Sequence, residues 1–136
     1  MTITVSQHTP GQLRQTIRIH SHQINADLTQ AAGGSDTGPD PHDLFDAAVA
    51  TCKAMTLQLF AKRKNIPLDE VKVEISRDDS AESKGLYQLY ATLELIGDLT
   101  KMEKLILMRP DQYYWGYERY KPPKSQLRQQ QHQGQS

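Results

Sequence analysis

The sequence predicts an α+β fold, and three patterns support that prediction. Three short segments that alternate between polar and apolar residues come first, at residues 2–7, 12–21 and 22–29. A long segment with helical spacing follows at residues 40–64, and two more alternating segments occupy residues 71–76 and 86–97. Strands and helices that occur in separate runs, rather than in strict alternation, are typical of α+β proteins.

The first three segments predict an antiparallel meander. Ile3 and Val5 lie on one face of the first segment, and Ile17 and Ile19 share a face of the second. The pair Pro10-Gly11 provides a turn between them, and the connection to the third segment is equally short.

Residues 31–41, AAGGSDTGPDP, form a loop by composition, and a long helix begins at their end. Asp40 is suited to cap the helix, Pro41 suits its first position, and the carboxylate of Asp43 suits its positive first turn. Apolar positions recur at steps of three or four residues and predict one buried face, made of Leu44, Ala48, Cys52, Met55 and Leu59. The basic run at 62–64 and the following Asn65 and Pro67 end the helix.

The second half predicts a β-hairpin and a shorter helix. Residues 71–76 alternate cleanly and should pair with residues 86–97, and residues 99–108 have helical spacing. From residue 109 the sequence lacks either period and becomes rich in glutamine, which is typical of disordered segments. We therefore divide the chain into a domain at 1–108 and a divergent, frame-shifted or disordered tail at 109–136.

Composition excludes several classes of function. The chain has 136 residues, with 16 basic and 16 acidic side chains, so its charge gives no reason to expect binding to nucleic acid or to an acidic membrane. Its first ten residues lack the pattern of a signal peptide, and it has no uninterrupted apolar run of membrane-spanning length. We expect a cytoplasmic protein without a cofactor.

The stretch GGSDTGPDPHDLFDAAVATCKAMTLQLFAKRK, followed by NIPLDEVKVEISRD, resembles the OsmC family of osmotically inducible and organic-hydroperoxide-resistance proteins. The resemblance extends over about residues 1–108. It implies an intertwined homodimer of α+β subunits in which a peroxidatic cysteine on the first long helix reduces organic hydroperoxides. It also implies a resolving cysteine near the C-terminus, a supporting arginine from the N-terminal strands and a carboxylate at the helix start.

The resemblance places Cys52 at the peroxidatic position. Ten residues earlier, where it implies a carboxylate, this chain has His42, with Asp43 next to it, and either side chain is a candidate. Arg18 is the candidate arginine, with Arg14 as the alternative. The sequence has one cysteine, so the resolving cysteine must be replaced by an external thiol reductant or by Cys52 of a second copy in the dimer.

Two interpretations of Cys52 remain open from the sequence. Cysteine often packs as a small buried apolar residue, and the alternative function is a non-catalytic stress protein that binds a small apolar ligand. A reactive Cys52 requires a nearby cation, because the thiolate is the nucleophile. His20 and His22, with His8 nearby, form only a weak metal-site pattern, because no third ligand is fixed by spacing.

Overall fold

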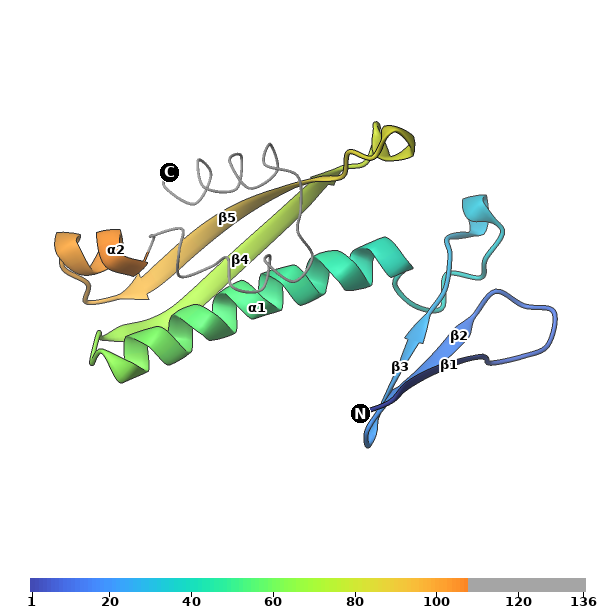
Figure 1. Cartoon of the computed structure of the whole chain (residues 1–136), viewed down its shortest axis with the longest axis horizontal. Helices are drawn as coiled ribbons and strands as arrows, with labels where there is room; N and C mark the ends of the chain where they lie inside the picture. Colours follow the sequence, from blue (N-terminus) through green and yellow to red (C-terminus); the bar gives the residue numbers. More distant parts are fainter. Residues whose placement is uncertain (108–136) are drawn as a thin grey trace. The chain divides into compact units, whose positions relative to one another are not determined.

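The computed structural model describes residues 1–107, and the segment at 109–136 that the sequence singled out lies outside this range (Figure 1). The chain forms two compact units, Met1–Phe45 and a second that begins at Asp46. The strands and helices follow in the order β1 (Ile3–Gln7), β2 (Gln15–Ile19), β3 (His22–Ala26), α1 (Pro41–Arg63), β4 (Leu68–Asp78), β5 (Gln88–Gly97) and α2 (Lys101–Leu107). Short 3₁₀ helices occur at Gln30–Ala32 and Glu82–Lys84. The predicted α+β class and element order are confirmed.

The first unit contains the predicted meander, an antiparallel sheet in the order β1-β2-β3. Its register aligns Val5 with Ile17 and Ile17 with Ile24, so the apolar side chains share one face of the sheet. That face is largely uncovered in the single chain, since Ile3, Val5 and Ile24 are 59%, 56% and 42% exposed.

The start of α1 has the reciprocal bonding of a capping box. The Asp43 backbone N–H donates to Asp40 Oδ1 at 2.8 Å, and the Asp40 backbone N–H donates to Asp43 Oδ2 at 3.2 Å. Two of the otherwise unpaired N–H groups at the helix start are satisfied in this way. The predicted roles of Asp40 in capping and of Pro41 as first helical residue are confirmed.

The end of α1 is closed by a Schellman motif. Asn65 has a left-handed φ of 55°, and its N–H donates to the Lys62 carbonyl at 3.3 Å. The Ile66 N–H donates to the Ala61 carbonyl at 2.8 Å. Asparagine tolerates the left-handed conformation better than most residues, which explains why the helix stops here.

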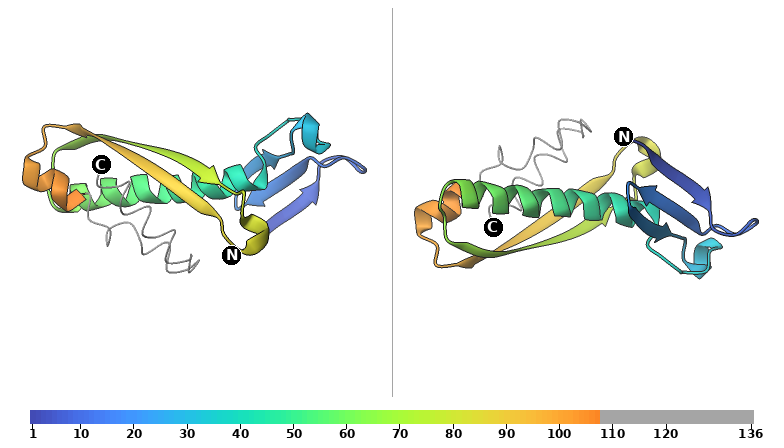
Figure 2. Two further views of the ribbon diagram at one scale, coloured as in Figure 1. Left: turned by 90° about the horizontal axis from the view of Figure 1, so that it is seen from above. Right: turned by 90° about the horizontal axis from the view of Figure 1, so that it is seen from below.

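In the second unit, α1 lies along a hairpin of β4 and β5 (Figures 1 and 2). The two strands pair antiparallel from Leu68 with Gly97 to Asp78 with Gln88, with a bulge between Leu68 and Glu70. The main core is a cluster of buried side chains from α1 and α2, packed against the hairpin: Leu57, Phe60, Ala61 and Leu107. A smaller cluster joins Val49 of α1 to Leu89 of β5.

The predicted buried face of α1 requires correction. The residues that α1 buries are Val49, Lys53, Leu57, Phe60 and Ala61. In the predicted face, by contrast, Met55 is 55% exposed, Leu59 is 65% exposed and Cys52 is half-buried. The helix therefore has two apolar faces, and the hairpin covers the one that the spacing did not predict. By length and composition alone α1 is also apolar enough to cross a membrane, a property that core helices of soluble proteins share.

Candidate functional site

Cys52 lies in the middle of α1, outside the set of residues that the helix buries. Its side chain is half-buried and forms no disulfide. It belongs to neither of the two core clusters, whose α1 members lie on the inner face. The position differs from that of a core cysteine, because the thiol is not enclosed by the packing of the helix on the hairpin.

Lys53, the next residue along the chain, is on the inner face and is only 3% exposed. Burial lowers the pKa of its ammonium from 10.5 to about 8, and the nearby Cys52 side chain acts in the opposite direction through its charge. A lysine with a pKa of about 8 is still mostly protonated at neutral pH. The residue after Cys52 is thus a buried lysine on the inner face of α1.

A polar network joins α1 to the hairpin one and a half turns before Cys52. Asp46 Oδ2 accepts a hydrogen bond from Arg77 Nη1 at 3.0 Å, and Asp46 Oδ1 accepts one from the Tyr87 hydroxyl at 2.6 Å. The Asp46 and Arg77 side chains are 13% and 25% exposed. Burial, followed by the bond to Asp46, raises the pKa of Tyr87. Because its partners come from α1, from β4 and from the residue just before β5, the network fixes the rotation of α1 on the hairpin.

The other predicted site residues belong to the first unit. Arg18 lies on β2 with an exposed side chain, while Arg14 is half-buried and its Nε has no hydrogen-bond partner. His42 is half-buried in the first turn of α1, and Asp43 takes part in the capping box. The roles predicted for these four side chains toward Cys52 stay predictions.

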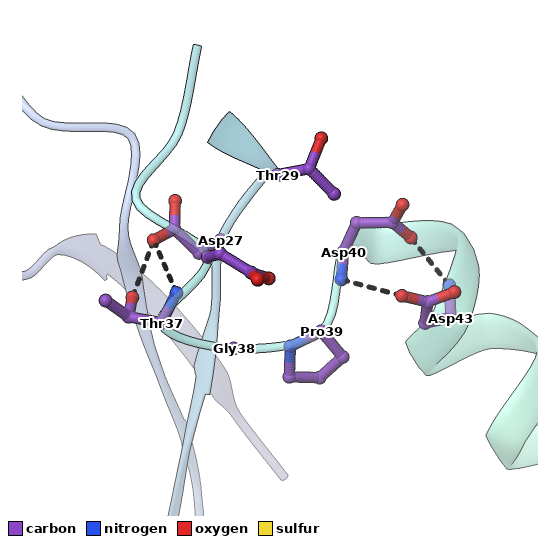
Figure 3. A pocket seen from close by; sticks show the side chains of 8 residues that line it. Asp27, Thr29, Thr37, Gly38, Pro39, Asp40 and Asp43 are labelled. Atoms are coloured by element: carbon purple, nitrogen blue, oxygen red, sulfur yellow. Dashed lines mark hydrogen bonds between the residues drawn. The ribbon is translucent and has the colours of Figure 1, made fainter. Parts of the chain in front are cut away.

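A pocket of about 350 Å³ in the first unit is lined by four carboxylates. Figure 3 labels three of them, Asp27, Asp40 and Asp43. Asp27 accepts hydrogen bonds from the Thr37 hydroxyl at 2.6 Å and the Thr37 N–H at 3.1 Å, which lower the Asp27 pKa to about 2. Asp40 and Asp43 are bonded in the capping box, and Asp36 completes the set. The printed bonds of Asp27, Asp40 and Asp43 fold the loop and start the helix. Within residues 1–107 no group of three or more histidine, cysteine or acidic side chains is placed to hold a metal ion.

Comparison with known proteins identifies the relatives of this fold. Residues 33–108, more than half of the chain, match the family described as OsmC-like protein, and the match includes Cys52 and all of α1. The chain belongs to the OsmC family. The resemblance seen in the sequence is thereby confirmed.

Solved structures of OsmC proteins share the fold at low sequence identity. A Psychrobacter arcticus protein assigned to the osmotic stress and detoxification response has a TM-score of 0.68 and 16% identity, covering 84% of this chain and 82% of its own. An OsmC-like protein of Mycoplasma pneumoniae has a TM-score of 0.64 and 17% identity, covering 78% and 75%. The organic hydroperoxide resistance protein OhrB of Bacillus subtilis is 26% identical, with a TM-score of 0.52 and coverage of 79% and 80%. No curated protein sequence matches the chain.

The polar contacts and the buried lysine on the inner side of α1 were not predicted from the sequence. Arg77 lies 31 residues after Asp46 in the chain and Tyr87 lies 41 residues after it, and no local pattern links them. Lys53 was missed for a different reason, because a lysine inside an apolar stripe is normally assigned to the solvent face. The step of four from Val49 to Lys53 to Leu57 was the one available signal.

Proposed function

We propose that this OsmC protein reduces organic hydroperoxides with Cys52 as the nucleophile, and that it works as a homodimer with an external thiol as reductant. The observation that supports the proposal best is the position of Cys52: it lies inside the OsmC match, half-buried, and outside the set of residues that α1 buries. Half-burial keeps the thiol reachable by a small peroxide while limiting its contact with water.

The chemistry is a displacement at oxygen. The Cys52 thiolate attacks the distal oxygen of the hydroperoxide, the O–O bond breaks, and the alkoxide that leaves takes up a proton to become an alcohol. Cys52 becomes a sulfenic acid. A small thiol then condenses with it to a mixed disulfide and releases water. A second thiol attacks that disulfide and restores Cys52, leaving an oxidised reductant.

The test is consumption of cumene hydroperoxide in the presence of dithiothreitol. We expect wild-type protein to consume the peroxide well above the buffer rate and Cys52→Ser to fall to that rate. Thr51→Ser, a change of similar size at an exposed neighbouring position, serves as the control and should keep the activity. Equal rates for wild type and Cys52→Ser in folded protein would refute the peroxidase proposal.

One observation favours the alternative, a non-catalytic protein that binds a small apolar ligand. The 136 residues contain a single cysteine, so the chain has no internal partner to resolve a sulfenic acid. If that alternative holds, peroxide treatment followed by a sulfenic-acid trap such as dimedone should leave Cys52 unmodified in mass spectrometry. An adduct at Cys52 would exclude it.

The homodimer is supported by two uncovered apolar surfaces. One is the outer face of α1, where Met55 and Leu59 are more than half exposed, and the other is the isoleucine-rich face of the N-terminal sheet. Exposed apolar surfaces of this kind commonly mark association sites. In a homodimer the same surfaces of a second copy are available to cover them.

Sedimentation velocity tests this assembly. We expect wild-type protein to sediment as a dimer and Leu59→Glu as a monomer, because the charge would be buried at the interface. Gln58→Glu adds the same charge at an exposed neighbouring position and should remain dimeric. A monomeric wild type, or a dimeric Leu59→Glu, would contradict the proposed interface.

A further inference from the structure

The outward side of the β4–β5 hairpin is uncovered in the part of the chain that the structure describes. Alternate residues of both strands pack on the core clusters, and those between them are exposed. On the exposed side the register places Glu70 opposite Ile96 and Lys72 opposite Glu94, and Glu74 is bonded to Lys72 at 3.1 Å. These five residues form the acidic face, whose three glutamates and one lysine give it a net charge of −2.

The acidic face favours positive charge. Lys72 is the one cation that the described strands β4 and β5 carry on their exposed side. The hydrogen bond from Glu74, followed by the charges of Glu74, Glu94 and Glu70, raises the pKa of Lys72 above its ordinary value. Since one lysine does not balance three carboxylates, the face would attract further cations.

Exposed apolar side chains lie at the same end of the hairpin. Ile96 is the last residue but one of β5, and α2, which follows, exposes Met102 and Leu105. These two residues are three positions apart and so share a side of the helix. Leu107 is fully buried in the main core and ties α2 to this end of the hairpin (Figure 1). The chain therefore leaves the described structure where exposed apolar and acidic side chains come close in the sequence.

The segment at 109–136 has chemistry complementary to this surface. It contains five basic and two acidic side chains, whereas residues 1–108 contain 11 basic and 14 acidic ones, so the two parts carry net charges of +3 and −3. Its aromatic residues come first, in YYWGYERY at 113–120, and Lys121, Lys124 and Arg128 follow. The hairpin has the same order, because from its α2 end the exposed residues are first apolar and then acidic.

The segment is also long enough to cover this surface. Tyr113 is six residues after Leu107. Six residues of extended chain reach about 20 Å. The acidic face extends along β5 from Ile96 to the row of Thr92 and Glu74, a distance of about 13 Å. The stretch from Trp115 to residue 124 can span that distance without being fully extended.

We propose that residues 113–128 of this chain's own C-terminal segment bind to the acidic face, with the aromatic side chains at its apolar end and the basic side chains beside the glutamates. The aromatic rings supply the apolar contact area, and the basic groups set the position along the hairpin. The glutamine-rich end after residue 128 takes no part. Cys52 belongs to α1 and not to this surface, so the inference does not depend on the peroxidase proposal.

Trp115 provides the first test, because it is the only tryptophan of the chain and its fluorescence reports on this segment alone. In the folded full-length protein we expect emission at shorter wavelength, and weaker quenching by acrylamide, than in a synthetic peptide of residues 109–136, since the indole would be packed on apolar side chains. Dilution should change neither value. Values equal to those of the peptide would overturn the proposal. A return to the peptide values on dilution would also overturn it, by assigning the contact to a second copy.

Trypsin cleavage after Lys124 tests the role of the charges, with each rate divided by that of the peptide under the same conditions. We expect Glu70→Gln with Glu94→Gln to speed this cleavage about 3- to 10-fold, because exposed charge pairs are individually weak and trypsin cuts the unbound form. The control is Asp79→Asn with Glu82→Gln, which removes two negative charges from the connection between β4 and β5, at the other end of the hairpin (Figure 1). It should leave the rate unchanged. Circular dichroism establishes that both double variants are folded.

Salt tests the same contact without any variant. Raising KCl from about 0.05 M to 1 M should also speed the normalised cleavage of wild-type protein, because charges at an exposed surface are strongly screened. A normalised rate that does not change with salt would overturn the proposal, and so would equal rates in the two double variants, because either result would show that the acidic face does not hold the segment.

Discussion

The two faces of α1 have similar apolar content but different surroundings. The inner face contributes Leu57, which is fully buried, and it packs on the hairpin. The outer face contributes Leu59, which is 65% exposed, and it includes Cys52. The inner face also holds a buried cation, whereas the outer face holds the candidate nucleophile. The comparison shows that one helix can stabilise its own chain with one side and leave large apolar side chains exposed on the other.

The largest expected difference between the faces is in the cost of removing a leucine. Leu57→Ala should lower the free energy of unfolding by about 3–4 kcal/mol, because it leaves a cavity in the main core. Leu59→Ala should cost less than about 0.5 kcal/mol in dilute protein, since most of its side chain is already in water. Urea unfolding measures both.

Protein concentration sharpens this first prediction. If the outer face is a dimer contact, the cost of Leu59→Ala should increase with protein concentration, whereas the cost of Leu57→Ala should not. If Leu57→Ala and Leu59→Ala lowered the free energy of unfolding equally in dilute, monomeric protein, the two faces would not differ in their contribution to stability.

The next largest effect is a gain in stability from Lys53→Met, about 2–3 kcal/mol at pH 7. The Lys53 pKa falls from 10.5 in the unfolded chain to about 8 in the folded one, so the unfolded chain binds more protons between these values. Wild-type stability should therefore rise as pH increases from 8 to 10.5, and the advantage of the variant should shrink over the same range. Urea unfolding at pH 7 and pH 10 checks this. If Lys53→Met were as much more stable than wild type at pH 10 as at pH 7, the stability gain could not come from removing the charge.

Asp46→Ala should lower the free energy of unfolding by about 2 kcal/mol, because it removes the acceptor that Arg77 and Tyr87 share on the inner face. Thermal unfolding measures the loss, and Asp79→Ala is the control. The Asp79 carboxylate lies 3.9 Å from Arg77 Nε and is 53% exposed, so its removal should have little effect.

Tyr87 adds a pH dependence to this network. Its pKa is raised above the ordinary 10.0 in the folded protein, so the neutral phenol contributes stability below pH 10, and that contribution is lost as pH rises further. In Tyr87→Phe the alkaline loss should be smaller than in wild type. An identical alkaline profile for both proteins would show that Tyr87 does not cause it.

Among the substitutions expected to destabilise the fold, the smallest loss is at the start of α1, which belongs to neither face. Asp40→Ala should cost about 1 kcal/mol by removing the cap that accepts from the Asp43 N–H. Asp40→Asn should retain most of that stability, because asparagine is an equally good cap. Helix content by circular dichroism and the midpoint of thermal unfolding check the pair. A loss as large as that of Leu57→Ala would mean that Asp40 does more than cap α1.

Local signals in the sequence predicted the fold well. The caps at Asp40 and Asn65, the alternation of β4 and the pairing of the hairpin are all set by neighbours in the chain. The buried face of α1 was predicted wrongly because Lys53 interrupts the stripe from Val49 to Leu57, which left the uninterrupted outer stripe as the better pattern. Spacing alone shows which residues share a face but not which face meets the hairpin.

The sequence likewise indicated one part of the candidate site and not the rest. Cys52 was chosen from the motif around it, and its role stays a prediction, although the family match includes that stretch. The bonds of Asp46 to Arg77 and Tyr87 join residues far apart in the chain, and only the folded hairpin brings them together. The burial of Lys53 could not be predicted either, because it depends on how deeply α1 is covered in the folded chain.

Residues that attach α1 to the hairpin lie on both sides of Cys52. Asp46 is bonded to the hairpin before it, and Leu57 is packed in the main core after it, about 16 Å further along the helix axis. The direction in which the thiol points is therefore set by residues that do not surround it. Substitutions on the outer face can change what approaches Cys52 without turning it, so in the proposed peroxidase substrate preference and the direction of the nucleophile can evolve as separate traits.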